Sequence, residues 1–187
     1  MTSHRVSLLA LDGVLSFELG MPLTILQSLG APYSVSVVTP TESGVTTDNG
    51  LRLSSAGSLA ELTTADTVVV PAYAFERGIP EDVAEALRTC HERSKRVVSL
   101  CVGAFALAQS GLLTGRRATT HWIQIERLAR GHPDITVDRN VLFVDEGTVL
   151  TSAGTSAGID LCLHLVREDF GAAIANQAAR NAVAAPP

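Results

Sequence analysis

A cysteine between an apolar run and a run of small residues is the most informative chemical feature of this sequence. Arg96 to Leu100 predicts a buried strand, and Val102 to Ser110 predicts a helix of small residues that stops at Gly111. Cys101 stands between them, where a sharp strand-to-helix turn, the nucleophile elbow, would strain the backbone and present the side chain. The N-terminus of the following helix favours thiolate over thiol. The alternative is a small buried hydrophobic residue, which most free cysteines are.

Two other residues can exchange protons with this cysteine. Glu18 lies just beyond the first predicted strand, Val6 to Leu11, and its carboxyl group can hydrogen-bond a thiol or activate a water. His121 ends a predicted strand, Arg117 to Thr120, and a Cys–His pair is a standard way to activate sulfur. Two plainer roles stay open: Glu18 as an acid in the first turn of a helix, and His121 as a helix cap packed against Trp122.

The remaining cysteines favour the core. Cys90 and Cys162 fall on the apolar stripes of two predicted helices, Glu81 to Ser94 and Ala157 to Glu168. Three cysteines without metal-type spacing indicate free thiols in a reducing compartment, the cytoplasm. The sequence predicts no metal site, because His, Cys, Asp and Glu do not recur at ligand spacing. It also predicts no cofactor, and the loop Thr151 to Gly158 lacks the Gly-Lys-Ser/Thr ending of a phosphate loop.

Short apolar strands that alternate with amphipathic helices must position these residues. The alternation predicts one α/β domain over residues 1–187, with a mostly parallel sheet, helices on both faces and functional groups at the carboxyl ends of the strands. Because proline is tolerated only near a helix start, the first helix should break between Leu19 and Pro22. Further strands are predicted at Tyr33 to Val38, Gly50 to Ser54, Thr67 to Val70, Ile135 to Val144 and Thr148 to Ser152, and further helices at Pro22 to Leu29, Trp122 to Arg130 and Ala172 to Val183.

Composition narrows the function classes. The 187 residues are 46% hydrophobic and 18% charged, which is typical of a globular domain. The net charge is −5, and only the Arg116-Arg117 pair resembles a basic cluster, so these residues by themselves are not expected to bind DNA. No apolar stretch reaches the roughly 18 residues of a membrane span, and the N-terminus has no secretory signal.

Four segments together resemble a known family. Over nearly its whole length the chain is similar to the PfpI-like, class I glutamine-amidotransferase-like domain found at the N-terminus of GlxA-type AraC-family transcriptional regulators and as stand-alone isonitrile hydratases. The resemblance implies a flavodoxin-like three-layer sandwich, usually dimeric, whose pocket holds the elbow cysteine and an acid from the first helix. The matching segments are Phe17 to Pro22, Cys101 to Phe105, Gly111 to Trp122 and Thr151 to Asp160.

Three positions depart from the hydratase pattern that the resemblance implies. Val102 stands where threonine is expected, Glu18 where aspartate is common, and Ala72 where a glycine would help present an N–H group to an oxyanion. These changes favour sensing over hydrolysis. The ligand pocket implied by the resemblance is formed by Cys101, Glu18, Ala72, Tyr73, Val102 and His121.

We therefore expect a ligand-sensing and dimerising domain of an AraC-family regulator. Its partners would be a small-molecule ligand and a second copy of the chain, with DNA bound only by a C-terminal helix-turn-helix domain that lies outside these residues. The alternative is a cysteine-dependent hydratase or amide hydrolase that uses Cys101 and Glu18. A thiol-based stress protein is the weaker third hypothesis.

Overall fold

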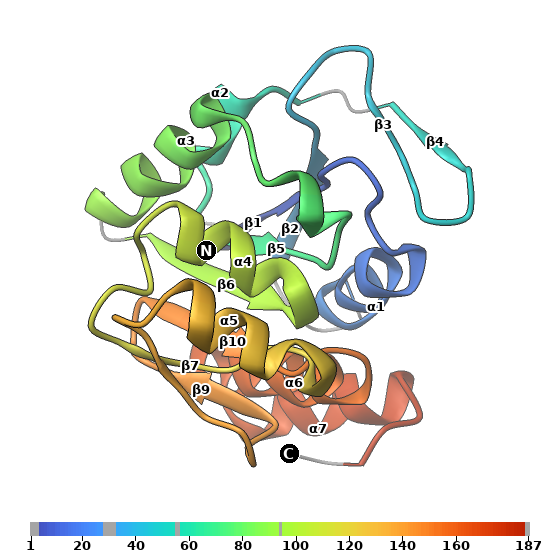
Figure 1. Ribbon diagram of the computed structural model, residues 1–187. Coiled ribbons are helices and arrows are strands. Elements are labelled where there is room, and N and C mark those ends of the chain that lie inside the picture. Colours follow the sequence, from blue (N-terminus) through green and yellow to red (C-terminus); the bar gives the residue numbers. More distant parts are fainter. Residues whose placement is uncertain (1–3, 28–32, 55–56, 94, 186–187) are drawn as a thin grey trace.

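A sheet of six strands runs through the part of the chain that the computed structural model describes, residues 4–27, 33–54, 57–93 and 95–185. The strand order is β2-β1-β5-β6-β10-β9, and only the pairing of β10 with β9 is antiparallel (Figure 1). The five parallel strands therefore end at one edge of the sheet, the carboxyl edge. The strands are β1 (His4–Leu9), β2 (Tyr33–Val38), β5 (Thr67–Val70), β6 (Arg96–Leu100), β9 (Phe143–Asp145) and β10 (Val149–Ser152).

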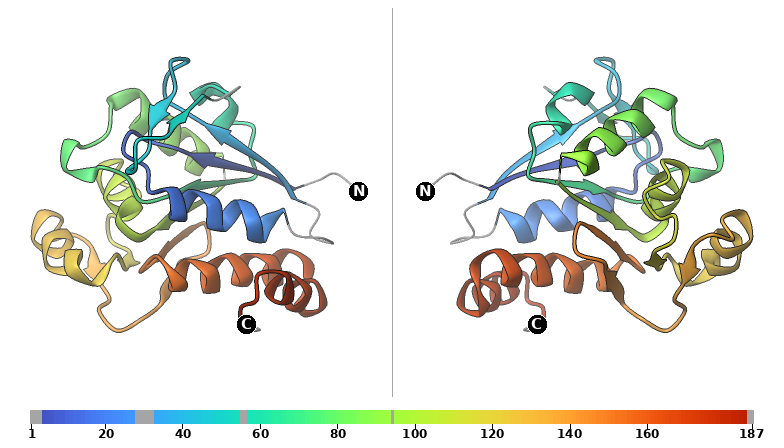
Figure 2. Two further views of the ribbon diagram at one scale, coloured as in Figure 1. Left: turned by 90° about the vertical axis from the view of Figure 1, so that its right-hand side faces the viewer. Right: turned by 90° about the vertical axis from the view of Figure 1, so that its left-hand side faces the viewer.

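Helices cover both faces of the sheet, which makes three layers (Figure 2). Alternate residues of one strand serve two cores: Val68 and Val70 pack with α2, α3, α4 and α5, whereas Val69 packs with α1, α6 and α7. The predicted flavodoxin-like sandwich is confirmed. The helices are α1 (Ser16–Leu26), α6 (Ser156–Phe170) and α7 (Ala172–Asn181) on one face, and α2 (Leu59–Leu62), α3 (Glu81–Glu92), α4 (Ala104–Gln109) and α5 (Ile125–Gly131) on the other.

The order of the strands reverses between β1 and β5. From β1 the chain first forms β2 on one side and then returns to form β5 on the other side of β1. In open α/β sheets such a switch point separates the loops at the carboxyl edge and is a common place for a ligand. The loops that follow β1 and β5 are therefore candidates for a binding site.

One predicted strand lies outside the main sheet. Only Arg52 and Leu53 of the segment predicted at Gly50 to Ser54 are extended; they form β4 (Arg52–Leu53), which pairs antiparallel with β3 (Val45–Thr46). Gly50 has a φ of 86° and belongs to the turn, because the Thr47 hydroxyl and carbonyl groups hydrogen-bond to the segment that follows.

Two other predicted strands were too long. The segment predicted at Arg117 to Thr120 contributes only β7 (Arg117–Ala118). The Thr119 N–H donates to the Thr151 hydroxyl and not to a backbone carbonyl of a neighbouring strand. The segment predicted at Ile135 to Val144 divides into β8 (Thr136–Val137), which pairs with β7, and β9. β9 pairs antiparallel with β10, on either side of the turn at residues 146–148.

The predicted break in the first helix was wrong. Helix α1 continues through Pro22, although proline cannot donate the hydrogen bond that the Glu18 carbonyl would otherwise accept. Pro22 is buried together with Leu19 and Ile25, and this packing compensates for the missing hydrogen bond. The helix ends at Leu26, and its predicted end at Leu29 lies outside the described residues.

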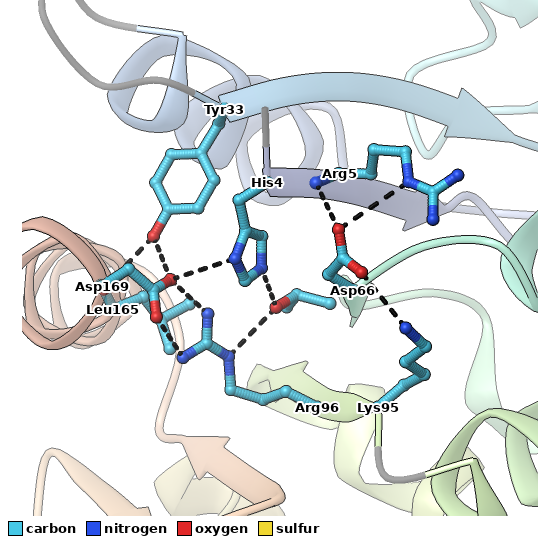
Figure 3. Close-up of polar contacts among 9 residues, drawn as sticks. His4, Arg5, Tyr33, Asp66, Lys95, Arg96, Leu165 and Asp169 are labelled. Atoms are coloured by element: carbon cyan, nitrogen blue, oxygen red, sulfur yellow. Dashed lines mark hydrogen bonds and ion pairs between the residues drawn. The ribbon is translucent and has the colours of Figure 1, made fainter. Parts of the chain in front are cut away.

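A polar network joins the amino edge of the sheet to the end of α6 (Figure 3). Arg96 donates two hydrogen bonds to the Asp169 carboxylate, and the Tyr33 hydroxyl donates a third at 2.5 Å. His4 and Arg96 both contact the Thr67 hydroxyl, at 2.9 and 3.0 Å. We call these five residues the amino-edge network.

The charges of the amino-edge network stabilise one another. Burial alone would raise the pKa of Asp169, but the bonds from Arg96 and Tyr33 outweigh it and leave that pKa below its ordinary value. Burial likewise lowers the pKa of His4, although Asp169 opposes the shift. The network therefore holds a charged carboxylate and favours a neutral imidazole.

Candidate functional site

Cys101 lies at the carboxyl end of β6 in a strained backbone conformation. Its φ is 55°, a left-handed value that is uncommon outside glycine, and the chain passes directly into a 3-10 turn, η2 (Cys101–Gly103), and then α4. Gly103 makes the close approach to β5 possible, since a Cβ there would lie 2.2 Å from the Val70 carbonyl oxygen. The predicted unfavourable backbone at Cys101 is confirmed.

The loop between β10 and α6 forms the wall behind this cysteine. Gly154 has a φ of 85°, and a Cβ on it would lie 2.3 Å from the Cys101 Cβ and 2.9 Å from Oε1 of Glu18. The next residue, Thr155, also has a positive φ, 48°, and its N–H donates to Oε1 of Glu18 at 2.6 Å. The Gly/Ser/Thr loop thus packs tightly on the cysteine turn and holds the carboxyl group of Glu18.

Glu18 and Cys101 form a buried pair across Gly154. Glu18 is fully buried, and its Oε2 has no hydrogen-bond partner among the described residues. Cys101 is 5% exposed, and Cys90 and Cys162 are also buried, as the sequence predicted. The predicted proximity of Glu18 to Cys101 is confirmed: both side chains meet the same glycine, and the charge of Glu18 acts on the cysteine.

Burial determines the protonation of this pair. It raises the pKa of Glu18, and the hydrogen bond from Thr155 offsets only part of the rise. Burial, followed by the charge of Glu18, raises the pKa of Cys101 to about 12, against the opposing effect of the Val102 N–H. Desolvation thus opposes the effect of the helix N-terminus, which sequence analysis expected to favour thiolate.

The pair can still exchange a proton. A protonated Glu18 carries its hydrogen on a carboxyl group whose Oε2 has no partner among the described residues, so it can donate to a sulfur that becomes negatively charged. Cys101 would become a thiolate only when a bound molecule or a chemical step changes the polarity around it. Burial thus favours the neutral forms of both the thiol and the carboxyl group.

His121 does not join this pair through any hydrogen bond recorded for the described residues. Its ring lies 6.0 Å from the ring of Trp122, at the start of a 3-10 turn, η3 (Trp122–Gln124). The preceding residue makes the contact instead: the Thr120 hydroxyl donates to the Cys101 carbonyl oxygen at 2.9 Å. Thr120 therefore supports the strained turn, a role that sequence analysis missed.

The other predicted ligand-binding residues pack around the turn. Val102 is buried and directs its N–H at the Cys101 sulfur. Ala72, just beyond β5, is buried, and its carbonyl oxygen accepts the Leu15 N–H at 2.9 Å. Ala72 is not among the residues with positive φ, unlike Cys101. That Ala72 and Tyr73 leave no pair of N–H donors aimed at an oxyanion beside Cys101 stays a prediction.

A pocket lies near the cysteine turn, but Cys101 does not line it. This pocket of about 520 Å³, which we call the switch-point pocket, is lined by residues that follow β1, β2 and β5. Tyr73 lines it, whereas Cys101 and Glu18 do not. Sequence analysis did not single out Asp12, which lines this pocket; its place shortly after the first strand was the available clue.

The comparisons with known proteins agree with this geometry. The description of the DJ-1/PfpI family matches residues 4–168. The chain belongs to this family. It is 34% identical over 135 residues to the HTH-type transcriptional regulator CdhR of Pseudomonas aeruginosa. This match covers 71% of this chain and 40% of CdhR. It is also 30% identical over 169 residues to isonitrile hydratase of Pseudomonas putida. This second match covers 89% of this chain and 72% of that enzyme.

A solved structure shows the same fold. The crystal structure of an AraC family transcriptional regulator from Pseudomonas putida aligns with a TM-score of 0.85 and 20% identity, over 95% of this chain and 98% of that one. The resemblance stated from the motifs is confirmed: the homologues include both helix-turn-helix regulators and an isonitrile hydratase. The chain spans less than half the length of CdhR, so only part of that regulator is represented here.

The described residues contain neither a membrane-spanning helix nor a metal-binding cluster. No helix in this part of the chain is long and apolar enough to cross a membrane. Within the same residues, no group of three or more His, Cys, Asp or Glu side chains is placed to hold a metal ion.

Proposed function

We propose that this chain is the ligand-sensing and dimerising domain of an AraC-family, GlxA-type transcriptional regulator. The observation that carries the proposal is the burial of Cys101, which is 5% exposed and lies beside a fully buried glutamate; this burial raises the pKa of the thiol. An activated nucleophile needs a depressed pKa or an adjacent base. Similarity to CdhR and GlxA supports a regulatory role for this kind of domain.

In this proposal DNA is contacted by a separate domain, and the setting is the cytoplasm. The chain has a net charge of −5, which opposes contact with phosphate groups. The DNA-binding part would follow the present chain, and a reading frame that continues beyond Pro187 into a helix-turn-helix would support this. Gel-shift titration of that longer product on its own promoter region is the direct test of regulation.

Dimerisation is proposed through an apolar surface at the start of α1. Phe17 and Leu51 are 56% and 60% exposed, and the Asp48 carboxylate accepts bonds from the N–H and hydroxyl groups of Ser16, which join their two segments. Light scattering should give a dimer for the purified chain and a monomer when Phe17 and Leu51 are both replaced by serine. A wild-type chain that stays monomeric at tens of micromolar, a concentration typical of modest self-association, contradicts this part.

The second candidate function is a cysteine-dependent hydratase or amide hydrolase. It is favoured by the match to isonitrile hydratase, which extends over 89% of this chain. In that case Cys101 would attack the substrate and Glu18 would move the proton. Val102, Ala72 and the longer acid at position 18 count against it, because the hydratase pattern has different residues there.

Turnover by the purified chain decides between the two. We expect no conversion of isonitriles, amides or glutamine above the background rate, and we expect Cys101→Ala to keep the fold. Conversion well above background that disappears in Cys101→Ala would replace the sensor proposal with the hydratase one. Val102→Thr serves as a control, since the hydratase hypothesis predicts a rise in rate and the sensor hypothesis predicts none.

A further inference from the structure

The amino-edge network contains a chain of hydrogen bonds whose direction is fixed (Figure 3). Nε of Arg96 lies 3.0 Å from the Thr67 hydroxyl oxygen, and it can only donate, because a guanidinium has no acceptor. The Thr67 hydroxyl therefore accepts from Arg96 and has its own hydrogen to give. The recipient is Nε2 of His4, at 2.9 Å.

This direction assigns the tautomer of His4. A neutral imidazole that accepts a hydrogen bond at Nε2 carries its hydrogen at Nδ1. Nδ1 lies 4.0 Å from Oδ2 of Asp169, so this hydrogen is on the side of the ring nearest the carboxylate. The neutral ring with its hydrogen at Nδ1 thus fits both neighbours.

A proton added to His4 breaks this pattern. Nε2 becomes a donor, so the Thr67 hydroxyl then lies between two donors and its own hydrogen loses its acceptor. Thr67 is fully buried, and a buried hydrogen without an acceptor is costly. The hydrogen-bond geometry therefore opposes the imidazolium form.

The charges around His4 do not remove this opposition. Asp169 is paired with Arg96, and Asp66 is paired with Lys95, so neither carboxylate is free to receive an imidazolium. Burial lowers the pKa of His4, the two carboxylates oppose the shift, and Arg96 and Lys95 add to it. The titratable and charged groups that face His4 are Tyr33 on β2, Asp66 before β5, Lys95 before β6, Arg96 on β6 and Asp169 at the end of α6, and Asp66 also pairs with Arg5 on β1.

The ring of His4 also packs against the end of α6. It meets the ring of Phe170 edge-on at 6.5 Å, and Tyr33 meets the same ring at 4.7 Å. Phe170 is the last residue of α6, and Gly171, with a φ of 86°, leads directly into α7. His4 therefore joins the start of β1 to the point where α6 turns into α7.

We propose that His4 is the proton sensor of an acid-sensitive latch between the start of β1 and the end of α6. In the closed state the neutral ring accepts from Thr67 and packs on Phe170. Protonation moves the ring away from Thr67 into water, and the start of β1 and the end of α6 open together. The latch is distinct from the proposed ligand sensing, because it lies at the opposite edge of the sheet from the Cys101 turn.

Hydrogen exchange of the purified chain tests the latch. Protection factors, which correct for the intrinsic effect of pH on exchange, are compared about one pH unit above and below 6.5, the ordinary pKa of histidine. We expect protection at the start of β1 and the end of α6 to fall several-fold at the lower pH, with a limit of about tenfold for one proton. The pKa of Asp169 lies below 3.8, so this carboxylate stays charged throughout. Amides of α3 serve as the internal reference and should keep their protection.

Matched variants make the result specific. His4→Gln does not titrate and keeps a side chain that can accept from Thr67, so its protection should not depend on pH. His164→Gln makes the same substitution elsewhere on α6, where it removes a contact of 2.7 Å with Asp145, and it should leave the pH response unchanged.

Nitrogen NMR tests the tautomer on the wild-type chain, without any variant. His4 should carry its hydrogen at Nδ1 at neutral pH. Thr67→Val removes the hydrogen that the neutral ring accepts, so it should raise the pKa of His4 relative to the wild-type chain, whereas Thr67→Ser should not.

A His4 ring with its hydrogen at Nε2 at neutral pH would overturn the inference. So would equal protection factors at the two pH values, or a pH response that survives in His4→Gln. A response that disappears in His164→Gln would assign it to the His164–Asp145 contact, and an equal fall across α3 would show unfolding of the whole domain; either result also overturns the latch.

Discussion

At the amino edge of the sheet, Asp169 accepts hydrogen bonds from Arg96 and Tyr33. At the carboxyl edge, Glu18 accepts one bond from Thr155, and its second oxygen has no partner among the described residues. Glu18 is buried and Asp169 is partly buried, yet the pKa of Asp169 is lowered and that of Glu18 is raised. The difference shows that the amino edge stabilises the fold, whereas the carboxyl edge keeps polar groups under-satisfied, as functional sites do.

Removing the carboxylate of the amino edge should have the largest effect. Asp169→Ala leaves the guanidinium of Arg96, whose side chain is only 17% exposed, without its ion-pair partner. We expect the free energy of unfolding to fall by about 3 kcal/mol, the usual loss when one partner of a buried pair is deleted. Urea denaturation measures it, with Arg139→Ala as the control.

Arg139 forms an ion pair with Glu126, and both side chains are more than half exposed. Its removal should lower the free energy of unfolding by less than about 1 kcal/mol. Equal losses for Asp169→Ala and Arg139→Ala would contradict the claim that the amino-edge network contributes more to stability than an exposed ion pair does.

The two tyrosines of the chain sharpen the comparison. The Tyr33 hydroxyl donates to the charged Asp169, so Tyr33→Phe should lower the free energy of unfolding by about 2 kcal/mol. The Tyr73 hydroxyl has no partner among the described residues, so Tyr73→Phe should change the free energy by less than about 1 kcal/mol, towards greater stability. Chemical denaturation of both variants under one set of conditions provides the measurement. A larger loss for Tyr73→Phe than for Tyr33→Phe would reverse the assignment of the two edges.

The smallest effect concerns pH. The folded pKa of Glu18 lies above its ordinary value of 4.5, so its contribution to stability is present below that pH and is lost as pH rises through the folded pKa. Glu18→Gln does not titrate, and its melting temperature relative to wild type should therefore rise between pH 4.5 and neutrality. If the melting temperatures of the variant and the wild type change equally with pH across this interval, the folded state does not disfavour the charged form of Glu18.

The amino edge should show the opposite dependence. The folded pKa of His4 lies below its ordinary value of 6.5, so its contribution to stability is lost as pH falls through that ordinary value. The pKa of Asp169 is also lowered, and its contribution disappears as pH falls through the folded pKa. His4→Gln should therefore make stability fall less steeply on the acid side than it does in the wild-type chain. Glu18→Gln is the control and should leave this acid-side fall unchanged.

The cysteine turn could be predicted from sequence because its causes are local. A buried strand followed at once by small residues fixes the position of Cys101, and Gly103 permits the close approach to β5 that the pattern implied. Its protonation could not be predicted in the same way. The walls that bury the thiol come from Glu18 and Gly154, which are far from Cys101 in the sequence, so local propensity carries no information about them.

The switch-point pocket was missed for the same reason. Asp12 and Arg77 meet only because β1 and β5 are neighbours in the sheet, although β2 lies between them in the chain. The error at Pro22 is different in kind: a local rule was correct about the missing hydrogen bond, but tertiary packing of α1 outweighed it. Long-range contacts thus decided the charge state, the pocket and the continuity of the first helix.

The contact at Gly154 also bears on how such a domain can diverge. A side chain at position 154 would strike the Cα and Cβ of Cys101, two atoms that every amino acid except glycine, which lacks the Cβ, would place there. The constraint therefore acts on the path of the backbone and is indifferent to the sulfur. A lineage can exchange the reactive atom and keep the turn, but it cannot enlarge residue 154 without rebuilding both loops. One inherited scaffold can in this way give rise to descendants that react with small molecules and to descendants that only recognise them.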